Sequence, residues 1–343
     1  MDRRVDLVID PLRGDKVPIS LPLRFRTPVE QTRRELGFAD WVDASDPIVA
    51  QAIALAGAAR RAEPPIDFAV FGGVAHRLRC RSSNDAATGL RHPVHDLDLA
   101  IRLKDARTFQ RWLAGVARSA GSALTFFETP GDKIYNSLSG GRRLRWHMVP
   151  EMNDAQVTLG TLDLVADVFE FCHRIDVRGD VDRGAVQGWT LEPAHLLLTK
   201  AQYLLRVPKG DATAIADRVL EPFGRSDVLI GPEAKDVRDL LALLHDHPVE
   251  ESAAAIAPSS LRSALEDDWG LWKTVGLTLG MVARSPILRS APGPLRSRIE
   301  PRLAQVREIV AAQTPKRRFA IFGGAWWQDV DTPPSTDTTV GVG

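Results

Sequence analysis

Two aspartates separated by one apolar residue are the most informative feature of this 343-residue chain. Asp96 and Asp98 flank Leu97 in an otherwise apolar run, and side chains two apart on a strand point to the same face. Their carboxylates would stand side by side, and adjacent carboxylates repel unless a cation or a proton lies between them. A solvated pair on a half-exposed strand is the alternative. The chemistry favours a Mg²⁺ site, because Mg²⁺ is usually held by one or two carboxylates together with phosphates.

A glycine pair follows an earlier apolar strand. Gly72-Gly73 comes directly after Phe71, and a helix is predicted to begin at Val74. Taken alone, the pair indicates a tight turn, because glycine tolerates positive φ. Before a helix, it places backbone N–H groups where they face a phosphate. The pair and the two aspartates together predict a metal-dependent nucleotidyltransferase.

A third carboxylate is expected on the later apolar run Thr161–Phe169. In two-metal phosphoryl transfer such a group acts as a metal ligand or as the general base for the incoming hydroxyl. Asp163 is the preferred residue. Asp167 has the same strand parity and competes with it, and for either one a loop or capping role is the alternative.

Cationic residues surround these positions in the sequence. Arg91, His92 and His95 lie just before the acidic strand, where they would contact phosphate, balance charge or serve only as loop cations. Lys200 lies among apolar residues of a predicted helix. A solvated or snorkelling lysine is the common case, but a buried ammonium needs an anionic partner, and a triphosphate would suit.

The composition is that of an ordinary globular protein. Lys+Arg and Asp+Glu both number 44, so the net charge is zero, and nucleic-acid binding would depend on local basic patches. Two cysteines, Cys80 and Cys172, are too few for a disulfide framework and indicate a reducing cytoplasmic location. The first residues lack the apolar segment of a signal peptide, and no apolar run is long enough to span a membrane.

The spacing of apolar residues, together with capping residues, Pro and Gly, predicts the helices and strands of the first half. Residues 1–30 read as an irregular or weakly stranded segment. Asp46-Pro47 begins a helix, since Asp is a good N-cap and Pro suits the first position. The pattern then predicts a strand at Asp67–Phe71, a loop over 79–93, and an amphipathic helix over Ala106–Ala120.

The second half is predicted to change character near residue 190. Residues 121–178 read as strands, including a hairpin that begins at Ile134 and turns at Ser139-Gly140-Gly141. From Leu191 to about residue 312 the pattern is helical, and Leu271–Val282 reads as a buried helix. The polar tail from Asp329 is expected to be disordered.

These elements predict an α+β protein: a mixed β-sheet with flanking helices, followed by a helical domain. The expected divisions are an N-terminal segment, a catalytic domain, a helical domain and a tail, at residues 1–45, 46–190, 191–328 and 329–343.

The motifs resemble those of the nucleotidyltransferase-fold superfamily, in particular its AbiEii-type toxin branch. The family's strand and glycine turn match Phe71-Gly72-Gly73, and its Asp-hydrophobic-Asp matches Asp96-Leu97-Asp98, preceded by Arg91. Its later carboxylate would fall on Asp163 and its helical lysine on Lys200. The stretch between Gly73 and Asp96 is longer than is usual there and implies an inserted loop. Weaker counterparts of a later motif are Arg206, Lys235, Asp236 and Asp239. Asp236 or Asp239 would orient Lys200 or Arg206, and the alternative is a salt-bridged helix surface.

The resemblance implies an enzyme, a transferase that moves a nucleoside monophosphate from ATP or another NTP to a hydroxyl acceptor. Asp96, Asp98 and Asp163 would be the catalytic and metal-binding residues, with Mg²⁺ as cofactor. The residues that bind the nucleotide would be Gly72, Gly73, Arg91 and Lys200. A tRNA 3′ end, a protein or a small molecule is the expected acceptor, and a toxin–antitoxin or phage-defence toxin with an antitoxin partner is the implied role. The alternative is a non-catalytic, nucleotide-binding regulatory module.

Overall fold

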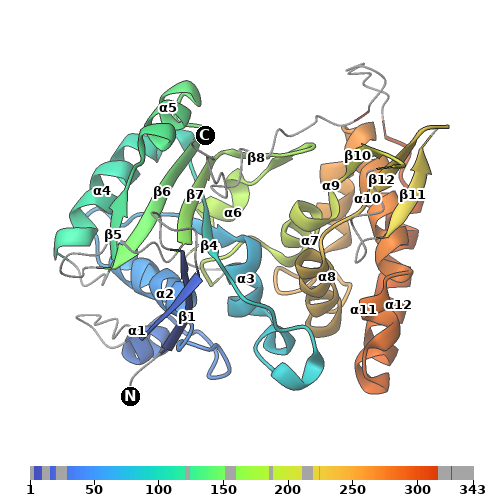
Figure 1. Cartoon of the computed structure of the whole chain (residues 1–343), viewed down its shortest axis with the longest axis horizontal. Coiled ribbons are helices and arrows are strands. Elements are labelled where there is room, and N and C mark those ends of the chain that lie inside the picture. Colours follow the sequence, from blue (N-terminus) through green and yellow to red (C-terminus); the bar gives the residue numbers. More distant parts are fainter. Residues whose placement is uncertain are drawn as a thin grey trace, which may run out of the picture.

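The computed structural model describes residues 4–9, 16–20, 29–119, 124–150, 160–184, 188–210, 219–223, 225–315 and Trp326. Within these residues the chain is a mixed α/β protein. A five-stranded sheet and its helices form one half of the molecule, and helices dominate the other half (Figure 1). The tail predicted from residue 329 lies outside the described residues.

The central sheet has the strand order β3-β4-β7-β6-β5. Its middle pair, β4 and β7, is parallel, and the other neighbouring pairs are antiparallel. Leu97 and Leu99 of β4 are fully buried, as their alternation with the two aspartates predicts. The strands are β3 (Ala69–Phe71), β4 (Asp96–Ile101), β5 (Leu124–Phe127), β6 (Arg143–Pro150) and β7 (Gly160–Ala166).

Helices predicted in the first half are confirmed, with small shifts at their ends. The side chain of Asp46 caps helix α2 by accepting from the backbone N–H of Ile48 at 3.0 Å and of Val49 at 3.2 Å. The elements are α1 (Val29–Glu35), α2 (Pro47–Arg60), α3 (Gly72–Arg79) and α4 (Ala106–Ser119), with short 3-10 helices η1 (Arg81–Ser83), η2 (Ala86–Thr88) and η3 (Leu103–Asp105). Helix α3 begins at Gly72 itself, so the glycine pair is the first turn of the helix.

The hairpin predicted to begin at Ile134 is wrong. Residues Pro130–Leu138 form helix α5, which is opened by a capping box between Thr129 and Asp132. The Thr129 backbone N–H donates to the Asp132 carboxylate at 2.8 Å, and the Asp132 N–H donates to the Thr129 hydroxyl at 3.1 Å. This reciprocal cap outweighs the strand preference of Ile134 and Tyr135.

The prediction of uninterrupted helix after Leu191 is also wrong in part. A three-stranded sheet of order β10-β12-β11 interrupts the helices. The elements from residue 168 onward are β8 (Val168–Glu170), β9 (Arg174–Asp176), α6 (Arg178–Asp182), α7 (Pro193–Ala201), β10 (Leu205–Pro208), β11 (Leu220–Phe223), β12 (Asp227–Ile230), α8 (Ala234–Asp246), α9 (Pro258–Glu266), α10 (Trp269–Ala283), α11 (Pro286–Ser290) and α12 (Gly293–Ala311).

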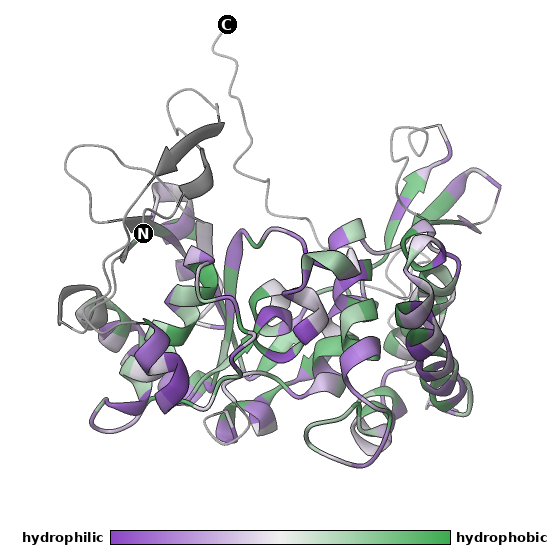
Figure 2. Cartoon of the chain, turned by 90° about the horizontal axis from the view of Figure 1, so that it is seen from below, coloured by the Kyte–Doolittle hydropathy of each residue, from purple (hydrophilic) through white to green (hydrophobic). Residues whose placement is uncertain are grey.

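The N-terminal segment contains an antiparallel pair, β1 (Arg4–Ile9) and β2 (Lys16–Ser20), which agrees with the weakly stranded prediction. One hydrophobic core runs from Val29 to Val310 and so joins the sheet to the helical half. The predicted buried helix is α10, whose Leu271 and Leu279 are fully buried. Figure 2 shows hydrophilic and hydrophobic residues interspersed along the helices, as expected where one face of a helix is buried and the other faces solvent. None of the described helices is both long and apolar enough to cross a bilayer.

Candidate active site

Four strands bring one row of side chains onto a single face of the central sheet. Phe71 of β3 is paired with Asp98 of β4, Asp98 with Asp163 of β7, and Asp163 with Arg145 of β6. Directly paired residues on neighbouring strands point to the same face and lie about 5 Å apart. Asp96 lies on this face two residues before Asp98. The two predicted aspartates and the preferred third carboxylate therefore meet.

Gly72 completes the row at the start of α3. Its φ is +65°, a left-handed conformation that favours glycine. A Cβ on Gly72 would overlap a carboxylate oxygen of Asp98, so the backbone of the glycine turn lies directly against that side chain. Two separate requirements, the φ angle and the space, thus call for glycine at this position. Gly73, by contrast, has room for a Cβ, whose nearest neighbours would be Val94 and His92.

The acidic groups of this face repel one another. Burial, together with the charges of Asp96 and Asp163, raises the pKa of Asp98 well above its usual range. Lys200 and Lys235 act in the opposite direction on the same group. A carboxylate that the fold makes hard to ionise is well suited to bind a divalent cation, because the cation removes the repulsion. The donor set of hard carboxylate oxygens fits Mg²⁺.

Asp163 has a partner that the sequence reasoning missed. Arg145 donates to its two carboxylate oxygens, from Nε at 2.6 Å and from a terminal guanidinium nitrogen at 3.1 Å. The pKa of Asp163 is raised by burial, even though Arg145 works to lower it. The sequence signal for this contact is the alternation of side chains along β6, which places Arg143 and Arg145 on the same face.

Asp167, the competing candidate, lies elsewhere. It occupies the break between β7 and β8 with φ of +63°. Its carboxylate accepts hydrogen bonds from the side chain of Arg102 and from the backbone N–H of Leu103, both at 3.1 Å. The geometry therefore gives Asp167 the capping role and brings Asp163 to the acidic face.

Lys200 is largely covered and lies between two carboxylates. Its ammonium lies 2.7 Å from Asp236 and 3.0 Å from Asp239, both on α8. Burial alone would lower the pKa of Lys200, but these two carboxylates raise it well above its usual value, so the side chain stays charged. The charge of Lys200 reaches Asp98, because it is among the groups that lower the pKa of that carboxyl.

The same cluster of charges connects the glycine turn to the inserted loop. The fully buried His76 donates from Nδ1 to the carbonyl oxygen of Gly72 at 2.7 Å, since a carbonyl only accepts. His92 lies 2.8 Å from a carboxylate oxygen of Asp239. Burial works to raise the pKa of Asp239, but His76, Lys200 and His92 hold it well below its usual range. Asp239 thus joins three elements behind the site.

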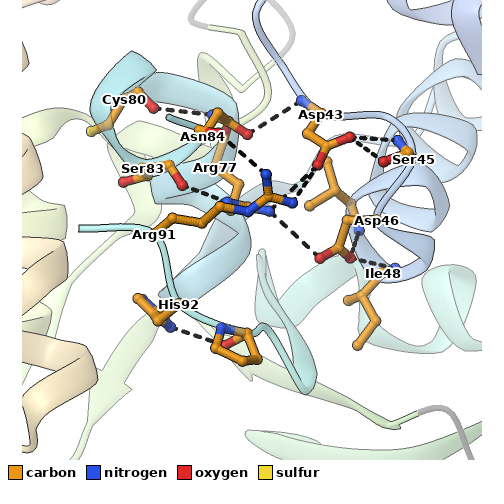
Figure 3. A network of polar contacts seen from close by, with 12 residues as sticks. Asp43, Ser45, Asp46, Ile48, Arg77, Cys80, Ser83, Asn84, Arg91 and His92 are labelled. Carbon is orange, nitrogen blue, oxygen red and sulfur yellow. Dashed lines mark hydrogen bonds and ion pairs between the residues drawn. The ribbon is translucent and has the colours of Figure 1, made fainter. Parts of the chain in front are cut away.

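Arg91 points away from the acidic face. Its guanidinium lies 2.7 Å from Asp43 and extends toward the segment before α2, where Asp43 also meets Arg77 (Figure 3). The geometry makes Arg91 a partner of that segment, and the predicted phosphate contact has no support in these interactions.

A different set of residues lies close enough together to bind a metal ion. In the described part of the chain, one group of at least three His, Cys, Asp or Glu side chains has ligand atoms that all lie within 4.8 Å of one another. This group is Asp180, Glu192 and His195. Asp180 accepts there from the backbone N–H of Glu192 at 2.8 Å and from His195 at 2.6 Å, which ties α6 to α7. The three predicted carboxylates are spaced more widely, with Asp163 held by Arg145.

A hollow of about 640 Å³ lies between the inserted loop and α12, lined on one side by Ala87 and Thr88 and on the other by Pro292, Pro294, Leu295, Ser297 and Arg298. None of the predicted site residues lines it.

No family model matches the chain, and no curated protein and no solved structure matches it either.

Proposed function

We propose that this chain is a Mg²⁺-dependent nucleotidyltransferase, which moves a nucleoside monophosphate from an NTP to a hydroxyl acceptor. The observation that carries the proposal is the packing of Gly72 against the Asp98 carboxylate, beside Asp96 and Asp163 on one face of the sheet. A phosphate-binding turn and a set of metal-binding oxygens then meet at one point, as phosphoryl transfer requires.

Each residue has a distinct task in this proposal. Asp96 and Asp98 hold Mg²⁺, which when bound neutralises charge on the triphosphate. Gly72 and Gly73 present backbone N–H groups of the first turn of α3 to the phosphates. Asp163 accepts the proton of the acceptor hydroxyl while that oxygen bonds to the α-phosphorus; the bond to the β-phosphate oxygen breaks and pyrophosphate leaves.

Lys200 contributes from behind the site. Its paired carboxylates keep it protonated and fixed, so that its positive charge acts on the acidic face without needing to contact the nucleotide. We therefore assign Lys200 an electrostatic role, in which it favours the ionised form of Asp98. A lysine held in place before the reaction costs no reorganisation during it.

The acceptor is a tRNA 3′ end, a protein or a small molecule. Basic residues at the start of β6 support RNA, because the exposed Arg142 lies just before the strand and the half-buried Arg143 begins it, on the strand that carries Arg145. Toxicity, and control by an antitoxin, are the biological role that the motif resemblance suggests.

The test is transfer of label. The purified protein is incubated with Mg²⁺, each α-labelled NTP and a cell extract, and the products are separated into RNA, protein and small molecules. We expect label in one fraction with the unaltered protein and none with Asp96→Asn/Asp98→Asn. The matched control is Glu308→Gln, an exposed carboxylate on α12. Equal labelling by the double variant would reject the proposal.

A second candidate, a non-catalytic nucleotide-binding module, is favoured by one observation. Arg145 engages both oxygens of Asp163, which reduces the ability of that carboxylate to accept a proton. A module of this kind would gain thermal stability from Mg²⁺ and NTP and would label nothing. Label transfer by the unaltered protein excludes it.

A further inference from the structure

A row of aromatic side chains continues from the acidic face. Phe71, which is paired with Asp98, meets Phe169 of β8 at a ring-centre distance of 5.2 Å and an angle of 72°. Phe169 in turn stacks on Phe171, with ring centres 5.6 Å apart and planes only 6° from parallel. The row therefore leads from the carboxylates to the end of the short β8–β9 hairpin.

The two ends of this row differ in their exposure. Phe71 and Phe169 are 5% and 8% exposed and belong to the core. Phe171 is only half-buried, and so is Tyr203, whose ring centre lies 6.2 Å away. Tyr203 comes three residues after Lys200, just beyond the end of α7. The half-buried pair thus lies where the sheet, the hairpin and the helical half meet.

A cation accompanies the half-buried pair. The guanidinium of Arg143 lies 5.8 Å from the ring centre of Phe171. This distance is close to the limit of about 6 Å for a cation–π contact. The contact is therefore loose, and a planar group that stacks on the ring or on the guanidinium can replace it. Arg143 and Arg145 share a face of β6, so the cation also connects the pair to the acidic site.

We propose that Phe171, Tyr203 and Arg143 form a stacking site for a nucleobase. Aromatic rings and arginine guanidinium planes are the groups on which nucleobases stack, and a site beside the acidic face is placed to orient the base of a nucleotide bound there. This inference rests on the proposed function. The base belongs either to the NTP or to the 3′ end of an RNA acceptor, because the stacking chemistry is the same for both.

The experiment compares ligands with and without a base. Equilibrium binding of each NTP with Mg²⁺ is measured against inorganic tripolyphosphate with Mg²⁺. A short RNA is measured against the same RNA with an abasic 3′ nucleotide. The variants are Phe171→Ala and the conservative Phe171→Trp. Phe223→Ala is the matched control, because Arg206 lies 5.2 Å from the half-buried Phe223 in the β10-β12-β11 sheet, away from the carboxylates.

We expect Phe171→Ala to weaken binding of the base-containing ligand roughly tenfold or more, the size of one lost stacking contact. Its base-free analogue should bind as before, Phe171→Trp should restore the affinity, and Phe223→Ala should change nothing. A loss confined to the NTP arm identifies the nucleotide as the source of the base, and a loss confined to the RNA arm identifies the acceptor.

Equal losses for ligands with and without a base, or no loss in either arm, would overturn the stacking proposal. The outcome is separable from that of the proposed function. Base-dependent binding by a protein that transfers no label would leave the stacking site standing and reject the transferase. Label transfer by a protein whose binding does not depend on the base would support the transferase and reject the stacking site.

Discussion

Replacement of Asp98 by asparagine should stabilise the protein in the absence of a divalent cation. The fold raises the pKa of Asp98, first through burial and then through repulsion from Asp96 and Asp163. Its folded pKa therefore exceeds its unfolded value of about 3.9, and the ionised form is disfavoured in the folded chain. If Asp98 is a cation ligand as we propose, a cost in stability without the cation is the expected consequence.

The size of the effect follows from the geometry. Carboxylates on neighbouring positions of a sheet lie about 5–7 Å apart, and at an effective dielectric of about 20 each charged pair costs roughly 2–3 kcal/mol. Arg145 offsets the charge of Asp163, so one such term remains for Asp98. Burial adds to this cost, whereas Lys200, Lys235 and the packing and hydrogen bonding lost in the asparagine variant reduce the gain. We expect a net stabilisation of about 1–2 kcal/mol, or a few degrees in Tm.

The assay is thermal unfolding in EDTA and in Mg²⁺ with a non-hydrolysable NTP. In EDTA the Tm of Asp98→Asn should exceed that of the unaltered protein. The difference should widen as the pH rises from about 3.9 through the folded pKa of Asp98, because the unaltered protein loses stability in that window and the variant does not. Saturating ligand at about 100 Kd should add about 2.7 kcal/mol to the unaltered protein and less to the variant. Glu308→Gln should follow the unaltered protein throughout.

Two results would refute this reasoning. A lower Tm of Asp98→Asn in EDTA would mean that the carboxylate stabilises the fold through contacts of its own. Equal gains from Mg²⁺ and nucleotide in both proteins would mean that Asp98 does not take part in binding them.

Three further changes have expected outcomes. Gly72→Ala should destabilise the protein by about 1–2 kcal/mol through its left-handed φ alone, and by more because its Cβ would overlap the carboxylate of Asp98. Gly89, with φ of +71°, has open space around it, so Gly89→Ala should show only the cost of the φ angle. Denaturant unfolding measures both. Asp239→Asn should cost about 3–5 kcal/mol in the same assay, because it removes the charge of the buried Asp239 from the Lys200 ammonium that it pairs with. A smaller loss would contradict the network behind the site. Burial works to lower the pKa of His195, but Asp180 outweighs burial and raises it. The pair therefore stabilises the fold below about pH 6.5, and this contribution is lost as the pH rises through the folded pKa. His195→Gln should remove that part of the pH dependence of Tm, and an unchanged pH profile would count against the assignment.

The parts of the fold that were predicted correctly depend on short-range signals. The Asp46 cap, the Gly72-Gly73 turn and the paired aspartates are all determined by residues within a few positions of one another. Helix α5 differs from its prediction although a short-range signal is present, because the capping box at Thr129 begins a helix in spite of the strand-favouring Ile134 and Tyr135. The strands around Arg206 were missed for a different reason, since they are short and pair only across a chain reversal.

The site was predicted less completely, because partners depend on the folded arrangement. Arg145 lies 18 residues from Asp163 in the sequence, and only the register of β6 and β7 brings them together. Arg91 is next to the acidic strand in the sequence but turns toward Asp43. Charge and sequence proximity identify a candidate residue, but they do not identify which of several opposite charges it meets. Lys200 differs, because Asp236 and Asp239 were among its predicted partners and both contact its ammonium, whereas the triphosphate contact stays a prediction.

The central claim is transfer of a nucleoside monophosphate at the carboxylate face. It is tested most directly by incubating the protein, Mg²⁺ and acceptor fraction with an α-labelled or a γ-labelled NTP in parallel. The account predicts that label enters the acceptor only from the α position, that γ label is released as pyrophosphate, and that Asp98→Asn abolishes both. Label that enters from the γ position, or that enters from the α position equally well with Asp98→Asn, would contradict it.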